Sequence, residues 1–251
     1  MIPWLTKNSP FPPVTEAMRE PNGLLAAGGE LAPSRLLDAY RHGIFPWFSQ
    51  GDPILWWSPD PRMVLFPEEF KVSNSLAKVL RKRAYEVRTD TAFEQTMRAC
   101  AAPRADQPGT WIDEQMIAAY CELHKLGYAH SVETWMEGKL VGGLYGVLIG
   151  KMFYGESMFS IAANASKIAL AHLCLRGPLM IDCQMYTPHL ASLGARQIPR
   201  DIFIARLEEL VNCAPDENWT FNTDLDFKCR GNIKDEISTV PDPHSSILTL
   251  K

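Results

Sequence analysis

The sequence lacks the features that mark membrane proteins, secreted proteins and strongly basic nucleic-acid binders. No segment reaches the run of about 18 apolar residues that a membrane-spanning helix needs, so no membrane contact is expected. Residues 1–7 have no charged start followed by an apolar run, which argues against a secretory signal peptide. Lys and Arg number 25 and Asp and Glu 29. The net charge of −4 excludes a globally basic nucleic-acid binder but leaves a local basic patch open.

Closely spaced cysteines are also missing. The six cysteines lie far apart and include no C-x-x-C pair, so neither a zinc site nor a thioredoxin-like motif has support. They are Cys100, Cys121, Cys174, Cys183, Cys213 and Cys229. We expect a reduced, cytoplasmic protein without a bound metal, in which most of these thiols are buried as small apolar groups.

The composition is that of an ordinary globular protein. Of the 251 residues, 46% are hydrophobic and 22% are charged, and the chain is long enough to bury most of its apolar surface. The N-terminal quarter is rich in Pro, Gly and Trp, and regular patterns begin near residue 62. We therefore expect a small N-terminal domain over residues 1–61, a larger domain over 62–222 and a loosely held tail over 223–251.

One helix fits within the first domain. Ser34 can cap its N-terminus, Leu36 and Tyr40 lie on an apolar stripe, and Gly43 can end it. Prolines forbid long regular elements elsewhere in this part of the chain. The aromatic residues that follow Gly43 are therefore expected in exposed loops.

Periodic apolar residues predict alternating helices and strands in the larger domain. The expected helices start at Ser73 or Asn74, carry Phe93 to Cys100, run from Asp113 to Gly127, and cover about 162–176 and 201–212. The expected strands are 64–66, 130–136, 140–148, 152–156 and 179–185. Close turns join the three middle strands and favour an antiparallel meander. This order predicts an α+β or mixed α/β domain.

Six segments together resemble those of the bacterial leucyl/phenylalanyl-tRNA–protein transferases, from about residue 10 to about residue 215. They are Arg19–Ala26, Gly43–Phe48, Trp56–Arg62, Gly155–Ser160, Asn164–Lys167 and Ile181–Gln184. Two features depart from the family pattern. The stretch at residues 175–178 is shorter than usual, and the tail beyond about residue 222 is longer than in most members.

The resemblance implies a fold and a reaction. Members have a small N-terminal domain and a GNAT-like (acyl-CoA N-acyltransferase-like) domain. They move Leu, Phe or, less often, Met from aminoacyl-tRNA onto the N-terminal Arg or Lys of proteins, which marks those proteins for N-degron degradation. The resemblance also implies a monomer that uses no metal, no coenzyme A and no other cofactor.

Asp182 and Gln184 are the first candidates for chemistry. In a strand they would point to one face, with Ile181 and Cys183 on the other. The attacking α-amine must be neutral, so a carboxylate could take its proton while an amide positions the amine or polarises the ester carbonyl. The resemblance makes these two residues the family's catalytic pair. From the residues alone, the alternative stays open that Asp182 and Gln184 form a polar strand end that caps a neighbouring loop.

Glu156 is the third catalytic candidate. It follows a predicted strand and Gly155, where a ligand can come close to the backbone. Its carboxylate could hold the incoming Arg or Lys N-terminus or orient the aminoacyl adenosine, and the resemblance places it in the family's active centre. The alternative is an ion pair in a surface turn, which would contribute about 0–1 kcal/mol.

Apolar residues near these motifs could form a pocket for a Leu, Phe or Met side chain. The candidates are Leu144, Phe153, Met158, Leu173 and Ile181, and Gly155 and Ser160 are included in the same aminoacyl-adenosine site. Met and Phe walls accept unbranched or γ-branched chains, whereas a β-branched chain would clash near Cα. Without the neighbouring motifs, such residues would be interpreted as core.

Trp47 and Trp111 are candidates for stacking on the terminal adenine. Each lies near Pro or Gly in an expected loop, and stacking of a base on an indole is worth about 1–3 kcal/mol. The resemblance also implies that both Trp residues lie near the aminoacyl adenosine. The alternative is that they anchor the interface between the domains. Trp56 and Trp57 are interpreted as interface or core residues.

Residues 71–88 carry a net charge of +5 within the acidic chain. The cations proposed for tRNA contact are Lys71, Lys78, Arg81, Lys82 and Arg83. On a helix Lys78, Arg81 and Lys82 share a face, which suits a phosphate backbone and little base reading. The alternative is an ordinary solvated helix face.

Three other functions are alternatives to this interpretation. A coenzyme A-dependent acetyltransferase needs a Gly-rich pyrophosphate loop at a helix start, and none precedes residue 162. A cysteine hydrolase would use Cys183 with His189, but Cys183 is expected to face away from Gln184. A non-catalytic tRNA- or RNA-binding module would use the basic helix and the tryptophans, and would leave Glu156 and Gln184 without a role.

Overall fold

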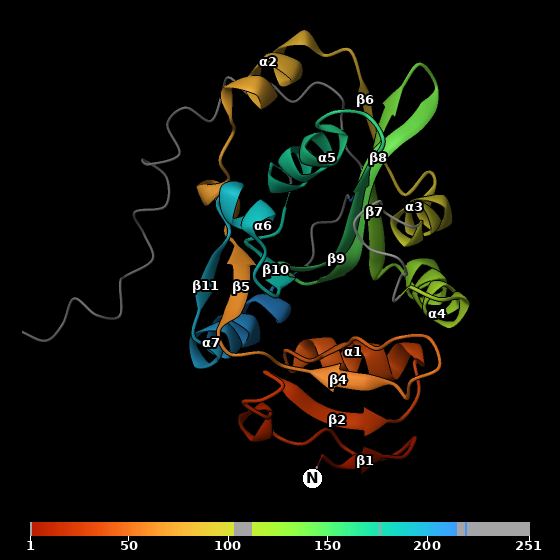
Figure 1. Ribbon diagram of the computed structural model, residues 1–251, viewed down its shortest axis with the longest axis vertical. Helices are drawn as coiled ribbons and strands as arrows, with labels where there is room; N and C mark the ends of the chain where they lie inside the picture. The colour runs from red at the N-terminus through yellow and green to blue at the C-terminus, as the bar shows by residue number, and fades with distance from the viewer. Residues whose placement is uncertain (1, 103–111, 176, 215–218, 220–251) are drawn as a thin grey trace, which may run out of the picture. The chain divides into compact units, whose positions relative to one another are not determined.

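The computed structural model describes residues 2–102, 112–175, 177–214 and 219. These residues belong to one compact unit built on two sheets (Figure 1). The four-stranded sheet has the order β1-β2-β4-β3, and the seven-stranded sheet has the order β11-β5-β10-β9-β8-β7-β6. An α+β chain with a small N-terminal layer and a larger mixed α/β part was predicted and is confirmed.

The strands are β1 (Trp4–Leu5), β2 (Leu24–Gly28), β3 (Phe45–Pro46), β4 (Leu55–Trp57), β5 (Arg62–Leu65), β6 (Glu86–Thr89), β7 (Ala129–Met136), β8 (Lys139–Ile149), β9 (Met152–Ser160), β10 (Met180–Gln184) and β11 (Arg196–Ile198). The helices are α1 (Pro33–Arg41), α2 (Asn74–Lys82), α3 (Phe93–Ala101), α4 (Glu114–Lys125), α5 (Ala165–Cys174), α6 (Pro188–Ser192) and α7 (Arg200–Val211). Short 3-10 helices lie at Val14–Glu16 and Pro67–Glu69. The tail predicted over residues 223–251 lies outside the described residues.

Side-chain caps start two helices where the sequence predicts them. Ser73 Oγ accepts a hydrogen bond from Leu76 N at the start of α2, and Asp113 Oδ1 accepts one from Met116 N at the start of α4. The predicted Ser34 cap is wrong, because α1 begins with Pro33 and its N-cap is Ala32, two residues before Ser34.

The predicted antiparallel meander is confirmed in β7, β8 and β9. In Figure 1, α5 lies on one side of these strands and α3 and α4 lie on the other. Helix α5 then leads from β9 to β10, which pairs parallel to β9 and antiparallel to β5. Strand β10 therefore lies between two strands that are far apart in sequence.

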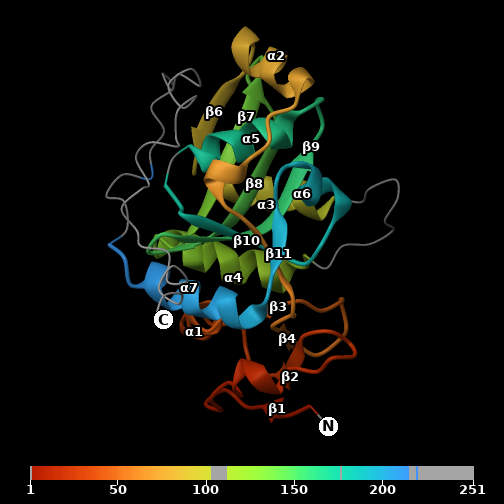
Figure 2. The same cartoon turned by 90° about the vertical axis from the view of Figure 1, so that its left-hand side faces the viewer.

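Helix α1 joins the N-terminal layer to the rest of the protein. It contacts β3 of its own layer and packs against α4 and α7, and the second view shows α1 beside α7 (Figure 2). Its inner face buries Leu36, Ala39 and Tyr40 completely. The chain passes from the first sheet to the second between Trp57 and Arg62.

A substitution at Gly142 can test the packing of α5 on the sheet. A Cβ at this position would lie 2.4 Å from Ala165 Cβ and 2.9 Å from the backbone carbon of Ala165. We expect Gly142→Ala to lower the free energy of unfolding by about 1–3 kcal/mol, because an overpacked contact with backbone cannot relax by rotation of a side chain. Urea denaturation followed by circular dichroism measures the change.

Gly155→Ala is the matched control, since Gly155 also lies within a strand of the same sheet. An added Cβ there meets nothing closer than 3.4 Å, so the free energy of unfolding should change by less than about 1 kcal/mol. Equal losses in the two variants would contradict the packing of α5 on Gly142.

Candidate functional site

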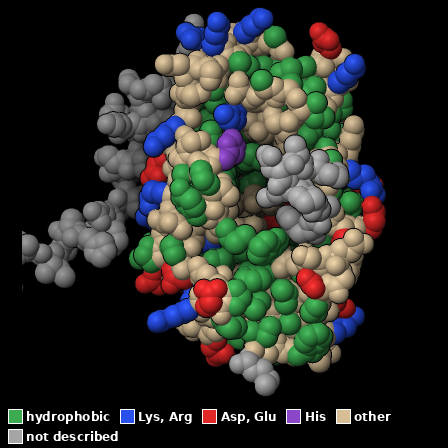
Figure 3. All heavy atoms as spheres, in the orientation of Figure 1, with side chains coloured by type: hydrophobic (Ala, Val, Ile, Leu, Met, Phe, Trp, Pro, Cys, Tyr) green, Lys and Arg blue, Asp and Glu red, His purple; other side chains and the backbone are tan. Residues whose placement is uncertain are grey.

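A hollow of about 440 Å³ opens where β9, β10, α5 and α6 meet, and the space-filling view shows the molecule hollowed near the centre of this face (Figure 3). Its lining residues are Trp47, Leu144, Phe153, Gly155, Glu156, Ser157, Met158, Leu170, Leu173, Ile181, Cys183, Gln184, Met185, Thr187, His189 and Leu190. Most of them are apolar, and Glu156 and Gln184 bring polar groups to the wall. Such a hollow can hold an apolar side chain beside reactive polar groups.

Most residues of the predicted aminoacyl-adenosine site line this hollow: Trp47, Leu144, Phe153, Gly155, Met158, Leu173 and Ile181. Ser160 lines a neighbouring hollow of about 430 Å³ instead, which shares Met158 and His189 with the first. Trp111 lies outside the described residues. Leu170 was missed, although its place three residues before Leu173 on a buried helix could have indicated it.

Trp47 lies at the edge of the hollow, directly after β3. Its side chain is 37% exposed, and its ring meets the edge of Trp57 at 5.5 Å between centroids. Trp57 Nε1 also donates to the carbonyl of Trp47 at 2.6 Å, which fixes the backbone below the indole. Trp56 and Trp57 are buried, as expected, and Trp47 keeps a surface on which a ligand can stack.

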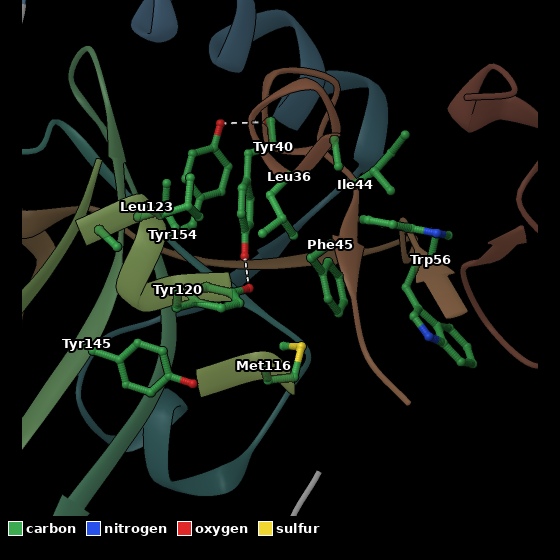
Figure 4. Close-up of a cluster of buried hydrophobic side chains, with 14 of the residues drawn as sticks. Leu36, Tyr40, Ile44, Phe45, Trp56, Met116, Tyr120, Leu123, Tyr145 and Tyr154 are labelled. Carbon is green, nitrogen blue, oxygen red and sulfur yellow. Dashed lines mark hydrogen bonds between the residues drawn. The ribbon is translucent and has the colours of Figure 1, made fainter. Parts of the chain in front are cut away.

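Glu156 lies within β9 and is held by three donors. Tyr40 OH donates to Oε1 at 2.8 Å, Tyr120 OH donates to Oε2 at 3.1 Å, and Gln184 Nε2 donates to Oε1 at 3.0 Å. The two tyrosine hydroxyls also lie within hydrogen-bond distance of each other (Figure 4). Because each hydroxyl carries one proton, the two tyrosines donate in at most two of these three contacts at a time. Tyr154 OH bonds the carbonyl of Tyr40 at 2.7 Å, which anchors α1 against β9. The side chain of Glu156 is thus held from α1, α4 and β10.

Burial raises the pKa of Glu156 to about 7, and the negative charge of Asp182 adds to the rise. The hydrogen bonds from Tyr40, Tyr120 and Gln184 act in the opposite direction, because they favour the carboxylate. The carboxyl can therefore take up or release a proton near neutral pH. With 8% of its surface exposed, Glu156 lies within a strand and not in a surface turn, so the alternative of a surface ion pair is wrong.

Asp182 does not line the hollow. It is fully buried, and both of its carboxylate oxygens accept hydrogen bonds from Arg62, at 2.8 Å from Nε and 2.6 Å from Nη2. The prediction that Asp182 and Gln184 share a strand face is wrong. The register of β10 against β5 shifts between these two residues, so the simple alternation of side chains ends there.

Gln184 takes a left-handed backbone conformation at this irregularity, with φ of 62°. Its backbone N–H donates to Asp182 Oδ1 at 2.8 Å, and its side chain reaches Glu156. Cys183 is turned into the hollow with Ile181, contrary to the prediction that it faces away. Burial raises the pKa of the Cys183 thiol, which disfavours the thiolate that a cysteine hydrolase needs.

The predicted tRNA-contacting cations lie on and beside α2. Lys71, Lys78, Arg81, Lys82 and Arg83 are all exposed. Helix α2 contains no acidic residue, and Figure 3 shows Lys and Arg side chains gathered at the end of the molecule where α2 lies. Within the described ranges, no helix has the length and apolarity needed to cross a membrane.

Comparisons with known proteins agree on one family. Residues 64–208 match the family model for leucyl/phenylalanyl-tRNA protein transferase, and residues 29–60 match the model for its N-terminal domain. The leucyl/phenylalanyl-tRNA--protein transferase of Nitrosospira multiformis is 64% identical, over 88% of this chain and 98% of its own. The protein of the same name from Chromobacterium violaceum is 62% identical, over 88% of this chain and 97% of its own.

Among solved structures, a GCN5-related N-acetyltransferase from Kribbella flavida covers 64% of this chain and 59% of its own. The identity is 10% and the TM-score is 0.32.

The hydrogen bonds around Glu156 can be tested by titration. Tyr120→Phe removes a donor that favours the carboxylate, so we expect the pKa of Glu156 to rise above its wild-type value at a cost of about 0.5–1.5 kcal/mol in stability. Carbon-13 NMR of labelled glutamate carboxyl groups, followed over pH, measures the shift. Tyr145→Phe is the control, because the buried Tyr145 hydroxyl makes no hydrogen bond to any of the described residues. The same pKa in all three proteins would contradict the arrangement.

Proposed function

The chain belongs to the leucyl/phenylalanyl-tRNA–protein transferase family and is an aminoacyltransferase, and from this premise we propose its substrates and its mechanism. The proposed donors are Leu-tRNA, Phe-tRNA and, less efficiently, Met-tRNA. The proposed acceptors are proteins with N-terminal Arg or Lys. The reaction takes place in the cytoplasm on a monomeric enzyme, and its products enter the N-degron pathway.

The observation that carries this proposal is the apolar hollow with Glu156 and Gln184 hydrogen-bonded to each other in its wall. The hollow is lined mostly by apolar side chains, and its volume of about 440 Å³ has room for an apolar side chain together with the group that carries it. The polar pair then lies where the ester carbonyl of a bound aminoacyl group would be attacked. Packing of an apolar core does not need a buried carboxyl group with a raised pKa. The presence of Glu156 in this wall therefore favours a chemical role.

The proposed reaction is aminolysis of the aminoacyl ester. The acceptor's α-amine attacks the carbonyl carbon, a C–N bond forms, and the bond to the ribose oxygen of the tRNA breaks. Glu156 in its carboxylate form takes the amine proton and can return it to the departing oxygen, a role that suits a pKa of about 7. The Gln184 amide positions the amine or polarises the carbonyl. Ester aminolysis changes no oxidation state, so the reaction needs no redox cofactor, and the proposed steps use no metal.

Donor choice follows from the walls of the hollow. Leu144, Phe153 and Leu173 are almost fully buried, and Met158 gives the lining some adaptability. Unbranched or γ-branched side chains fit such walls, whereas Val and Ile place bulk next to Cα. A misfit of one methylene group is worth about 1–3 kcal/mol, which gives preference among donors and not absolute selection.

Acceptor choice is proposed to use Glu156 as well. It is the one acidic side chain among the described residues that line the hollow. A carboxylate in a partly desolvated wall attracts a cationic N-terminal residue more strongly than an exposed one would. This supports Arg and Lys as acceptors and disfavours an N-terminal Asp.

Transfer of radiolabelled amino acid to peptides tests the proposed function. Leu-tRNA, Phe-tRNA, Met-tRNA and Val-tRNA would each be mixed with the enzyme and with peptides that begin with Arg, Lys, Asp or Ala. We expect label on the Arg and Lys peptides only, with Val at least about 10-fold below Leu in kcat/KM. Transfer to the Asp peptide would contradict the proposed acceptor specificity.

Gln184→Ala separates the enzyme from the non-catalytic RNA-binding module in the same assay. The variant should lose about 100-fold or more in transfer while its affinity for Leu-tRNA stays within about 2-fold. A wild-type protein that binds tRNA but transfers nothing to any peptide would contradict the proposed reaction and favour the binding module.

The proposed tRNA surface on α2 predicts a salt-dependent affinity. Each cation that neutralises a phosphate adds about 0.7–0.9 to the slope of log affinity against log salt concentration. We expect Lys78→Gln/Lys82→Gln to weaken binding of Leu-tRNA and to lower that slope by about 1–2. Lys125→Gln on α4 is the control and should leave both unchanged, because Lys125 is paired with Glu122 away from α2. An unchanged slope in the double variant would contradict the assignment of this helix.

A further inference from the structure

Arg62 is one of three charged residues that are fully buried among the described residues, with Glu133 and Asp182. It has no exposed surface. Its Nε and Nη2 donate to the Asp182 carboxylate, and its Nη1 donates to the carbonyl of Gly43 at 3.1 Å. The rings of Phe45 and Phe203 each lie 4.7 Å from its guanidinium carbon. A buried ion pair of this kind is costly to desolvate, so stability alone is a weak reason to have it.

The Asp182 carboxylate, which Arg62 holds, also stabilises the backbone conformation of Gln184. Asp182 Oδ1 accepts the N–H of Gln184 at 2.8 Å, at the residue where β10 leaves its regular register. A left-handed conformation costs a non-glycine residue about 1–2 kcal/mol, so Gln184 needs such a bond to keep it. The turn of the backbone brings the Gln184 amide within 3.0 Å of Glu156.

We propose that Arg62 is a positioning residue of this centre, which acts through Asp182 to hold Gln184 in the turned conformation that transfer requires. The inference rests on the proposed function, in which Gln184 touches the reacting groups. A lysine at position 62 would keep the positive charge but could not bind both carboxylate oxygens in one plane, so the carboxylate would lose its fixed orientation.

The same guanidinium ties the centre to the N-terminal layer. Gly43 follows α1, the helix that carries Tyr40 to Glu156. The bond from Arg62 to the Gly43 carbonyl thus holds the end of α1 while the bonds to Asp182 hold β10. Two of the three donors to Glu156, Tyr40 and Gln184, therefore lie on segments that Arg62 holds.

The first test compares Arg62→Lys with Arg196→Lys. Arg196 lies on β11, next to β5, and also binds a carboxylate with two nitrogens, that of Glu69, but it is exposed. We expect Arg62→Lys to fold, to lose about 10- to 100-fold in kcat and to keep the KM for Leu-tRNA within about 2-fold, because the apolar walls are intact. Arg196→Lys should stay within about 2-fold of wild type in kcat and KM.

A second readout does not depend on transfer. If Arg62→Lys frees the Gln184 amide from Glu156, the pKa of Glu156 rises, since a bond that favours the carboxylate is lost and Asp182 is less well neutralised. Carbon-13 NMR titration detects this shift even if the wild-type protein transfers no label, so failure of the proposed function and failure of this inference are distinguishable. Wild-type kcat together with an unchanged Glu156 titration would overturn the inference.

The double variant Arg62→Met/Asp182→Leu covers the case in which the single variant fails to fold. Apolar replacement of a buried ion pair commonly preserves stability, but it leaves the Gln184 N–H without its acceptor. We expect a cooperative thermal transition near that of the wild type with kcat lowered about 10- to 100-fold. A stable double variant with wild-type kcat would show that the pair serves stability and not positioning, and would overturn the inference.

Discussion

Arg62 on β5 and Asp182 on β10 form a charged pair that is fully buried, and the geometry of the candidate site depends on it. The pair joins two strands that lie side by side but are 120 residues apart in sequence. It fixes one end of a chain of bonds that runs through the backbone of Gln184 to the carboxyl of Glu156. The three Arg62 nitrogens, both Asp182 oxygens and the backbone N–H of Gln184 all have hydrogen-bond partners, so these buried groups are held in one arrangement.

The N-terminal layer is part of the same centre and not an appendage to it. Tyr40 on α1 binds Glu156, Gly43 accepts from Arg62, and Trp47 lines the hollow. The larger sheet supplies the acid and the amide, while the smaller layer holds them and forms one edge of the site. A low-dielectric surrounding built from both layers raises the pKa of Glu156 into the range where it can exchange a proton at neutral pH.

The sequence predicted most helices, the meander and the residues of the hollow, because periodic apolar patterns and caps such as Ser73 are local signals. That Glu156 and Gln184 carry chemistry stays a prediction. The sequence did not predict the contacts of Asp182, because strand alternation hides a shift in register and because its partner Arg62 is distant in the chain. Neither the short strands of the first layer nor the contacts of Tyr40 could be foreseen, since both depend on tertiary packing.

A crystal structure with a leucyl-adenosine analogue, in which an amide replaces the reactive ester, tests the central claim most directly. The account predicts that the leucyl side chain occupies the hollow against Leu144 and Phe153, with its carbonyl beside Gln184 and Glu156. A leucyl group bound elsewhere, with this hollow left without it, would contradict the account.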